Sequence, residues 1–185
     1  MAAGIQSPMS AAERAVGAPS RAEFHRAIAH RGDYWYAACL RITRNAELAA
    51  DAVQDALLSA WHKRHQYERS AKLETWIHRI AINAALQLLR RDRGSTHDEL
   101  NEEIPDDAPA VDCARANQEL NQDLASAMQK LSEMERTCFV LKHMEQWRLK
   151  EIAADMDTSV DTVKQALFRA VKKLRVLMAD RRSNP

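Results

Sequence analysis

The sequence predicts an all-α protein in which two small helical domains are joined by a flexible acidic linker. All Gly and Pro residues avoid two long stretches, 33–93 and 110–184. Both stretches are rich in residues that favour helices, and neither shows the sustained period-two alternation of a strand. The connection at 92–113 holds two prolines and eight carboxylates against one arginine. Such a segment repels itself and cannot bury a core, so it separates two helical blocks.

Length and composition agree with this division. A chain of 185 residues with 46% hydrophobic content suits two domains of about 60 to 75 residues each. The net charge is only +1, because the acidic linker offsets basic helices on either side of it. No apolar run approaches the roughly 20 residues of a membrane span. Residues 1–19 lack the basic start and apolar run of a signal peptide and predict a disordered tail.

The three cysteines are widely spaced and form no Cys-x-x-Cys pair. This pattern argues against a disulfide framework and against a thiolate zinc site, and it fits a reducing cytoplasm. His62 and His65 stand three residues apart but lack a neighbouring carboxylate or cysteine cluster. We therefore predict no metal and no cofactor.

The first block opens with a capping box, Ser20-Arg-Ala-Glu23, and a second helix is expected to follow Gly32. Asn45 is suited to cap a third helix, whose apolar stripe comprises Leu48, Ala52, Val53, Ala56, Leu57, Ala60 and Trp61. On another face of that helix, acidic residues recur every fourth position, at Glu47, Asp51 and Asp55. Like charges at this spacing destabilise an isolated helix slightly. The face is either ordinary solvated surface or the docking site of a basic partner.

A cation-rich connection at 62–72 contains Tyr67 and leads into a helix expected at about 74–91. Its core-facing residues would be Trp76, Ile77, Ile80, Ala84 and Leu88, and its basic stripe Arg79, Asn83, Gln87, Arg90 and Arg91. Aromatic and amide side chains beside a cationic loop suit an unstacked single strand of nucleic acid. Tyr67 is equally compatible with the edge of the domain core, and Trp76 is expected to belong to that core.

Residues 149–174 show two short amphipathic helices joined by a polar turn. Ser159 is a good N-cap, so the second helix should begin at about Val160. Its buried stripe would comprise Val160, Val163, Leu167, Ala170, Val171, Leu174 and Leu177. The opposite face is basic, with seven Lys or Arg against two Asp over 161–182. A lone basic helix could simply be solvated, but the preceding helix and turn favour a DNA-reading helix-turn-helix.

At this point the residues resemble a known family. Asp51-Ala-Val-Gln-Asp-Ala-Leu-Leu-Ser-Ala-Trp61, Leu73-Glu-Thr-Trp-Ile-His-Arg-Ile-Ala-Ile-Asn83 and Leu88-Leu-Arg-Arg91 are similar to region 2 of the extracytoplasmic function (ECF) sigma factors, within the sigma-70 family. The carboxyl-terminal block resembles their region 4. The resemblance divides the chain into a tail at 1–19, region 2 at 20–94, an acidic linker at 95–119 and region 4 at 120–182.

The resemblance implies a dissociable, non-catalytic subunit of bacterial RNA polymerase that selects promoters and helps to melt them. Asp51, Gln54 and Asp55 would dock on the clamp helices of the largest subunit, and region 4 on the flap of the second largest. Contacts to the minus-ten element would come from His65, Gln66, Tyr67, Arg69, Arg79, Asn83 and Arg90. Contacts to the minus-thirty-five element would come from Thr162, Lys164, Gln165, Phe168, Arg169 and Lys172. An anti-sigma factor and a cytoplasmic location are expected, and membrane insertion is not.

Three positions depart from the family pattern. Asp157 stands where glycine is usual, and Asp adopts the left-handed conformation less readily. Ala166 replaces a common arginine. Gln165 replaces a common serine and can pair bidentately with adenine, so it is expected to alter promoter preference.

Two other classes of function stay open at this stage. A stand-alone helix-turn-helix regulator would bind palindromic duplex without polymerase, but no heptad zipper or ligand-pocket pattern supports it. A helical enzyme would need a catalytic motif, and we find none in a plausible context.

Overall fold

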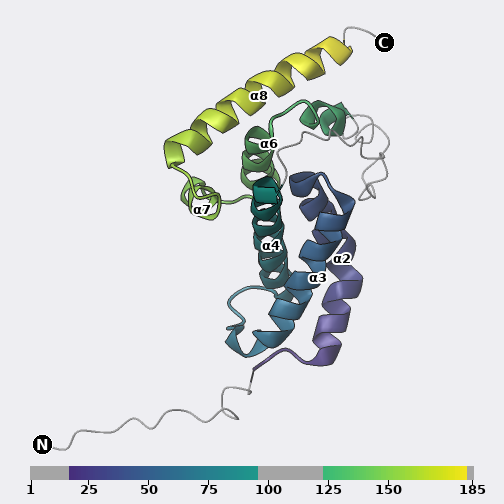
Figure 1. Ribbon diagram of the computed structural model, residues 1–185. Coiled ribbons are helices and arrows are strands. Elements are labelled where there is room, and N and C mark those ends of the chain that lie inside the picture. Colours follow the sequence, from purple (N-terminus) through teal and green to yellow (C-terminus); the bar gives the residue numbers. More distant parts are fainter. Residues whose placement is uncertain (1–16, 96–122, 183–185) are drawn as a thin grey trace, which may run out of the picture.

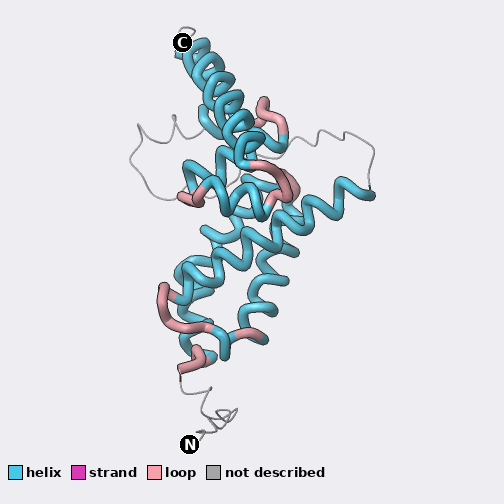
Figure 2. Tube along the Cα trace, turned by 90° about the vertical axis from the view of Figure 1, so that its left-hand side faces the viewer, coloured by secondary structure: helices cyan, strands magenta, loops and turns pink. Residues whose placement is uncertain are grey.

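The computed structural model describes residues 17–95 and 123–182, and all regular elements within these two ranges are helices (Figures 1 and 2). The predicted all-α class is confirmed. The expected acidic linker at 95–119 lies almost wholly outside the described residues, as does most of the expected tail at 1–19.

Helix α2 (Arg21–Thr43) begins at the predicted capping box. The Glu23 backbone N–H donates to Ser20 Oγ at 3.2 Å, and the Ser20 N–H donates to Glu23 Oε2 at 2.7 Å. The expected break at Gly32 is wrong, because α2 runs through it without interruption. One glycine costs a helix only about 1 kcal/mol, and packing of the flanking turns outweighs that cost. The helix ends instead at Thr43, where its C-cap residue Arg44 is left-handed with φ 54°.

Helix α3 (Ala46–His62) starts at the predicted cap, where the Leu48 N–H donates to Asn45 Oδ1 at 3.0 Å. A short 3₁₀ turn, η1 (Arg64–Gln66), leads to helix α4 (Leu73–Ser95). The three long helices pack against one another around Trp35, Ile42 and Ile77. The buried face of α3 is made of alanines, at positions 49, 52, 56 and 60. Small side chains let the neighbouring helices approach closely.

The most deeply buried face of α4 differs from the predicted one. Ile77 is fully buried as expected, but Trp76, Ile80, Ala84 and Leu88 are only half-buried. The deepest positions also include Ala81, Ile82, Ala85, Leu86 and Leu89. Because α4 packs against both α2 and α3, its buried face is wider than one helical stripe.

The second unit contains α6 (Glu133–Phe139), a π-helical turn labelled η2 (Val140–Met144), α7 (Leu149–Asp155) and α8 (Val160–Arg182). The predicted start of α8 is confirmed, since the Thr162 N–H donates to Ser159 Oγ at 3.1 Å. Asp157 has φ 49°, so it takes the left-handed conformation expected at the turn. Figure 1 shows α8 lying across α6 and α7, away from the lower end of the α2–α4 bundle.

An ion pair joins α8 to α6. Lys173 Nζ lies 2.7 Å from Glu135 Oε2, which also accepts the Ser132 N–H at 3.0 Å. Burial raises the pKa of Glu135, but the hydrogen bonds from Lys173 and Ser132 outweigh it and lower the pKa overall. Because the folded-state pKa lies below the usual value of 4.5, this carboxylate stabilises the fold above that pH. The contribution is lost as pH falls through the lowered folded-state pKa.

Exchange of Glu135 for Gln should therefore reduce the free energy of unfolding by about 1–2 kcal/mol at pH 7. Urea unfolding of wild type and Glu135→Gln at several pH values measures this. The gap between the two proteins should narrow as pH falls below about 4.5, the usual carboxyl pKa. A gap that stayed constant with pH would show that the ionised carboxylate is not the stabilising species.

Candidate nucleic-acid interface

The acidic face of α3, defined here as Asp51, Gln54 and Asp55, is fully on the surface, and all three side chains are exposed. Leu58 lies one turn further along the same face and is 52% exposed. The sequence pattern does not single out Leu58, because the helical period places only the neighbouring Leu57 on the apolar stripe. Leu58 therefore adds an exposed apolar side chain beside the carboxylates of this face.

Contacts of Tyr67 and Arg69 hold the connection between α3 and α4 against the rest of the bundle. The Tyr67 ring lies 5.3 Å from the Trp76 ring, and its hydroxyl donates to the Ala71 carbonyl at 2.5 Å. Burial raises the pKa of Tyr67, so its hydroxyl is protonated at neutral pH. Arg69, with φ 56°, bonds Glu23 at 3.2 Å and the Gly17 carbonyl at 3.0 Å. His65 and Gln66 are exposed in η1.

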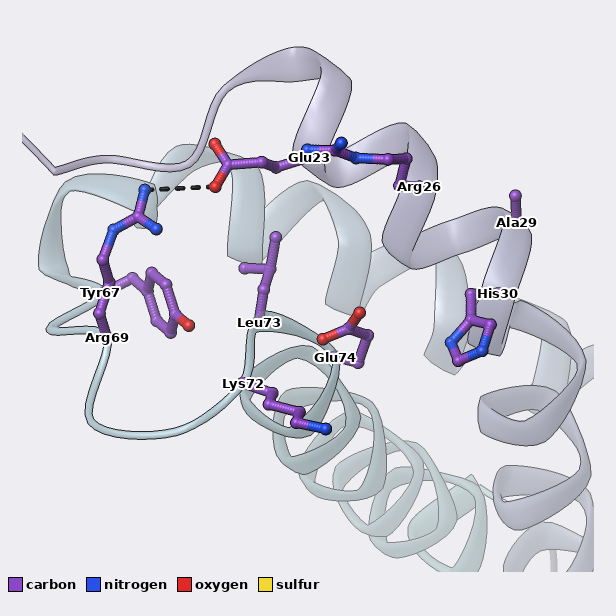
Figure 3. A pocket seen from close by; sticks show the side chains of 9 residues that line it. All are labelled: Glu23, Arg26, Ala29, His30, Tyr67, Arg69, Lys72, Leu73 and Glu74. Carbon is purple, nitrogen blue, oxygen red and sulfur yellow. Dashed lines mark hydrogen bonds and ion pairs between the residues drawn. The ribbon is translucent and has the colours of Figure 1, made fainter.

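These contacts border an open cavity of about 750 Å³ between α2 and the start of α4 (Figure 3). Its lining is Glu23, Arg26, Ala29, His30, Tyr67, Arg69, Lys72, Leu73 and Glu74. The cavity combines three cations and an aromatic ring with the carboxylates of Glu23 and Glu74, and Glu23 is paired with Arg69. Its cations and ring are groups that contact phosphates and unstacked bases. The sequence predicts the loop but not the approach of Arg26 and His30, because no local pattern relates α2 to a loop about 40 residues later.

The basic stripe of α4 is only partly free. Arg90, Gln87 and Arg91 are exposed. Arg79 instead bonds Glu151 of α7 at 2.9 Å and lies over the Trp147 ring, 5.0 Å from its centroid. Asn83 is half-buried, and within the described residues its Oδ1 has no hydrogen-bond partner. The stripe therefore meets the second unit at one end and solvent at the other.

The predicted face of α8 is exposed along its length, at Thr162, Lys164, Gln165, Phe168, Arg169 and Lys172. Phe168 is 72% exposed, which is unusual for a large apolar side chain and matches contact with a thymine methyl. Lys164 is 3.0 Å from Asp161. Thr162 Oγ1 lies 2.9 Å from Ser159 Oγ, so this hydroxyl takes part in the helix cap. Ala166 is buried and does not belong to this face.

Over the described ranges, no three His, Cys, Asp or Glu side chains gather as they would around a metal ion. Burial raises the pKa of the Cys39 thiol to about 12 and that of Cys138 to about 11, so both are protonated at neutral pH. Cys113 lies outside the described residues. In the same ranges, none of the helices has the length and apolar character required to cross a membrane.

Two family models match this chain in order. The model described as Sigma-70 region 2 covers residues 28–95, and the one described as Sigma-70, region 4 covers residues 121–174. The chain is 27% identical to the ECF RNA polymerase sigma factor SigW of Bacillus subtilis, over 80% of this chain and 84% of SigW. It is 31% identical to the RNA polymerase sigma factor CarQ of Myxococcus xanthus, over 76% of this chain and 80% of CarQ.

A solved structure shares the fold. It is the sigma factor RpoE of Bartonella quintana, crystallised with the anti-sigma factor NepR, and it matches with a TM-score of 0.55 at 22% identity. The match covers 85% of this chain and 97% of that one. The helical arrangement is therefore shared by proteins whose sequences have diverged widely.

Proposed function

Because this chain belongs to the ECF group of the sigma-70 family, we propose that three of its surfaces carry out different steps of transcription initiation. They are the acidic face of α3, the cavity beside Tyr67 and the exposed face of α8. As a sigma factor, the chain directs RNA polymerase to specific promoters. The observation that carries the division is that an acidic face, a cavity lined by charged side chains and Tyr67, and a basic helix lie on separate parts of the chain. No feature of the described residues favours a stand-alone regulator.

The acidic face of α3 docks on the clamp helices of the largest polymerase subunit. Exposure of Asp51, Gln54 and Asp55 supports this role, because basic partners relieve the repulsion of carboxylates spaced by one turn. Leu58 adds an apolar contact at the edge of the same surface. Region 4 docks on the flap of the second largest subunit, as the family resemblance implies.

The cavity beside Tyr67 holds a base of the minus-ten element that has left the duplex stack. Arg26, Arg69 and Lys72 supply positive charge around it, and Tyr67 supplies a planar ring. His65 and Gln66 stand on the same connection. Arg79, Asn83 and Arg90 then follow the non-template strand along α4. Unstacking a base costs a few kcal/mol, which the charge and stacking contacts offset.

Helix α8 enters the major groove at the minus-thirty-five element. In helix-turn-helix proteins, residues near the start of the recognition helix reach the base edges. Thr162, Gln165 and Phe168 occupy that part of α8, while Lys164, Arg169 and Lys172 are placed to reach phosphates or guanine.

Exchange of Gln165 for Ala should relax selectivity at one base pair of the minus-thirty-five element by about tenfold, because a bidentate amide–adenine pair discriminates by about 1–3 kcal/mol. Transcription by the reconstituted holoenzyme from a promoter library randomised at this element measures the change. Gln129→Ala removes an exposed glutamine outside α8 and should leave the preference unaltered. If Gln165→Ala keeps the wild-type preference, this residue does not read a base.

The direct test mixes the purified chain with bacterial core RNA polymerase and assays co-elution and transcription from fragments of its own genome. Co-elution together with new start sites is expected, and the start sites reveal the promoter motif. Tight binding to duplex DNA without polymerase association would instead establish a stand-alone regulator.

Three further properties belong to this proposal. The chain has no catalytic activity of its own and acts through the polymerase. It works in the cytoplasm, where bacterial transcription takes place. An anti-sigma factor binds the chain and keeps it inactive, in line with the solved RpoE–NepR complex of the same fold.

A further inference from the structure

Three sulfur atoms meet between α6 and the end of α7. The Cys138 thiol of α6 lies 3.8 Å from Met134 Sδ on the same helix and 3.7 Å from Met156 Sδ at the C-cap of α7. Residues four apart in a helix share a face, so Met134 and Cys138 present their sulfurs on one side of α6. These three residues, called here the sulfur cluster, lie outside the acidic face, the cavity beside Tyr67 and the exposed face of α8.

The chemistry of the sulfur cluster is that of a site for a soft metal ion. Thiolate and thioether ligands select soft ions such as Cu(I), whereas carboxylate and carbonyl ligands suit hard ions. The Cys138 thiol has a single hydrogen, while two thioethers lie within reach as weak acceptors. A metal ion in place of that hydrogen would bond all three sulfurs at once.

The spacing of the sulfurs fits a three-coordinate ion. A bond between a metal ion and a thiolate is about 2.3 Å long, so three sulfurs around one ion in a plane stand about 4.0 Å apart. The two Sγ–Sδ distances in the cluster, 3.7 and 3.8 Å, are close to this separation. The cluster therefore needs little rearrangement to take up an ion.

Burial and charge favour a monovalent ion. Cys138 is fully buried, and burial raises the pKa of its thiol to about 11. A thiolate in this place needs a compensating charge, since an isolated charge is costly in the protein interior. Cu(I) with one thiolate and two neutral thioethers makes a site of zero net charge, whereas Zn²⁺ would leave one positive charge uncompensated. Met134 and Met156 are half-buried, so their thioethers provide a path for an ion from solvent.

The sulfur cluster adjoins the turn of the helix-turn-helix. The Met156 N–H donates to the Ile152 carbonyl at 2.9 Å. The next residue, Asp157, is left-handed, and Ser159 caps α8. An ion that joins Met156 to α6 would therefore restrain the turn from which α8 starts. The spacing of Cys and His in the sequence does not reveal the site, because two of its ligands are methionines and one of these lies 18 residues from the cysteine.

We propose that the sulfur cluster is a Cu(I) site, with Cys138 as the thiolate ligand and Met134 and Met156 as thioether ligands. On binding, the Cys138 S–H bond breaks, a Cu–S bond forms and one proton passes to solvent. Copper stays in the Cu(I) state throughout, so the step needs no oxidant or reductant. The bound ion joins α6 to the end of α7, and its binding requires neither polymerase nor promoter DNA.

Anaerobic titration of the full chain with Cu(I), in competition with the chelator bathocuproine disulfonate, tests the site. The background variant Cys39→Ser/Cys113→Ser leaves Cys138 as the single thiol, and a hydroxyl at position 39 can keep the bond to the Ala81 carbonyl. One Cu(I) per chain is expected in this background. Its apparent affinity should rise about tenfold per pH unit from about pH 6 to pH 8, because one proton is displaced. Absence of Cu(I) uptake by the folded background variant would overturn the proposal.

Variants of the ligands test the geometry. In the same background, Cys138→Ser should abolish binding, and Met134→Leu/Met156→Leu should weaken it by about tenfold or more. Leucine nearly conserves the volume of methionine, so the core should stay packed, and circular dichroism verifies the fold. Met144→Leu/Met178→Leu exchanges two half-buried methionines elsewhere and should bind normally. Equal affinities of the two methionine variants would show that the thioethers are not ligands.

X-ray absorption at the copper K edge gives an independent measurement on the loaded background variant. Three sulfur neighbours at about 2.3 Å are expected, and the Met134→Leu/Met156→Leu variant should lose two of them. Nitrogen or oxygen neighbours in place of the thioethers would refute the ligand set.

Discussion

Charge reversal of the acidic face, Asp51→Lys/Asp55→Lys, is expected to abolish core polymerase binding and transcription while the chain stays folded. Neither carboxylate has an ion pair in the part of the chain that the structure describes, and both are exposed, so the fold does not depend on them. Loss of one partner of a desolvated charge pair costs about 2 kcal/mol or more at an interface. Two reversals should therefore weaken binding by well over a hundredfold.

The measurement is fluorescence anisotropy of labelled chain titrated with core polymerase, with circular dichroism to verify folding. Asp33→Lys makes a single reversal at an exposed position of α2 and should bind normally. Leu58→Ala should give an intermediate loss, because it removes apolar contact area without adding repulsion. Normal binding by the Asp51/Asp55 variant would show that polymerase docks on another surface.

The second large effect is expected at α8. Arg169→Glu should reduce promoter-directed transcription at least tenfold, because it places a negative charge against the DNA backbone or a guanine edge. The Arg169 side chain is exposed, and the buried side chains of α8 at Val163, Ala170 and Leu174 are unchanged in this variant. Binding to core polymerase should be unchanged.

Transcription from the mapped promoter at several salt concentrations measures this effect. If Arg169 contacts phosphate, Arg169→Ala should weaken all promoters alike and flatten the salt dependence of binding. If it contacts guanine, the loss should depend on the base. Arg21→Glu reverses an exposed charge at the start of α2 and serves as the control. Undiminished transcription by Arg169→Glu would show that Arg169 does not contact DNA.

Local signals predicted the helix starts well. Ser20 with Glu23, Asn45 and Ser159 all cap helices as expected, because a cap depends on a side chain and a backbone N–H only two or three residues apart. The exposed faces of α3 and α8 also follow from the helical period alone. The expected break at Gly32 failed because a glycine signals a weak point, and packing decides whether the helix ends there.

Residues that act through distant neighbours were not visible in the sequence. The helical period leaves Leu58 off the apolar stripe of α3, but only the packing of α3 against α2 and α4 shows that its side chain stays 52% exposed. The cavity beside Tyr67 likewise includes Arg26 and His30, whose approach depends on how the bundle closes. Burial is a property of the whole packing arrangement.

The sequence by itself determined the helical class, the helix starts, the charged faces and the family, because these depend on the order of neighbouring residues. Only the tertiary structure decided that Arg79 pairs with a carboxylate of the second unit. Its partner Glu151 lies 72 residues away along the chain, and nothing in either local pattern signals their pairing. An ion pair between separate units forms only where the attraction of the two charges outweighs the cost of removing them from water. That balance depends on how the units are oriented, and the orientation is a property of the folded molecule.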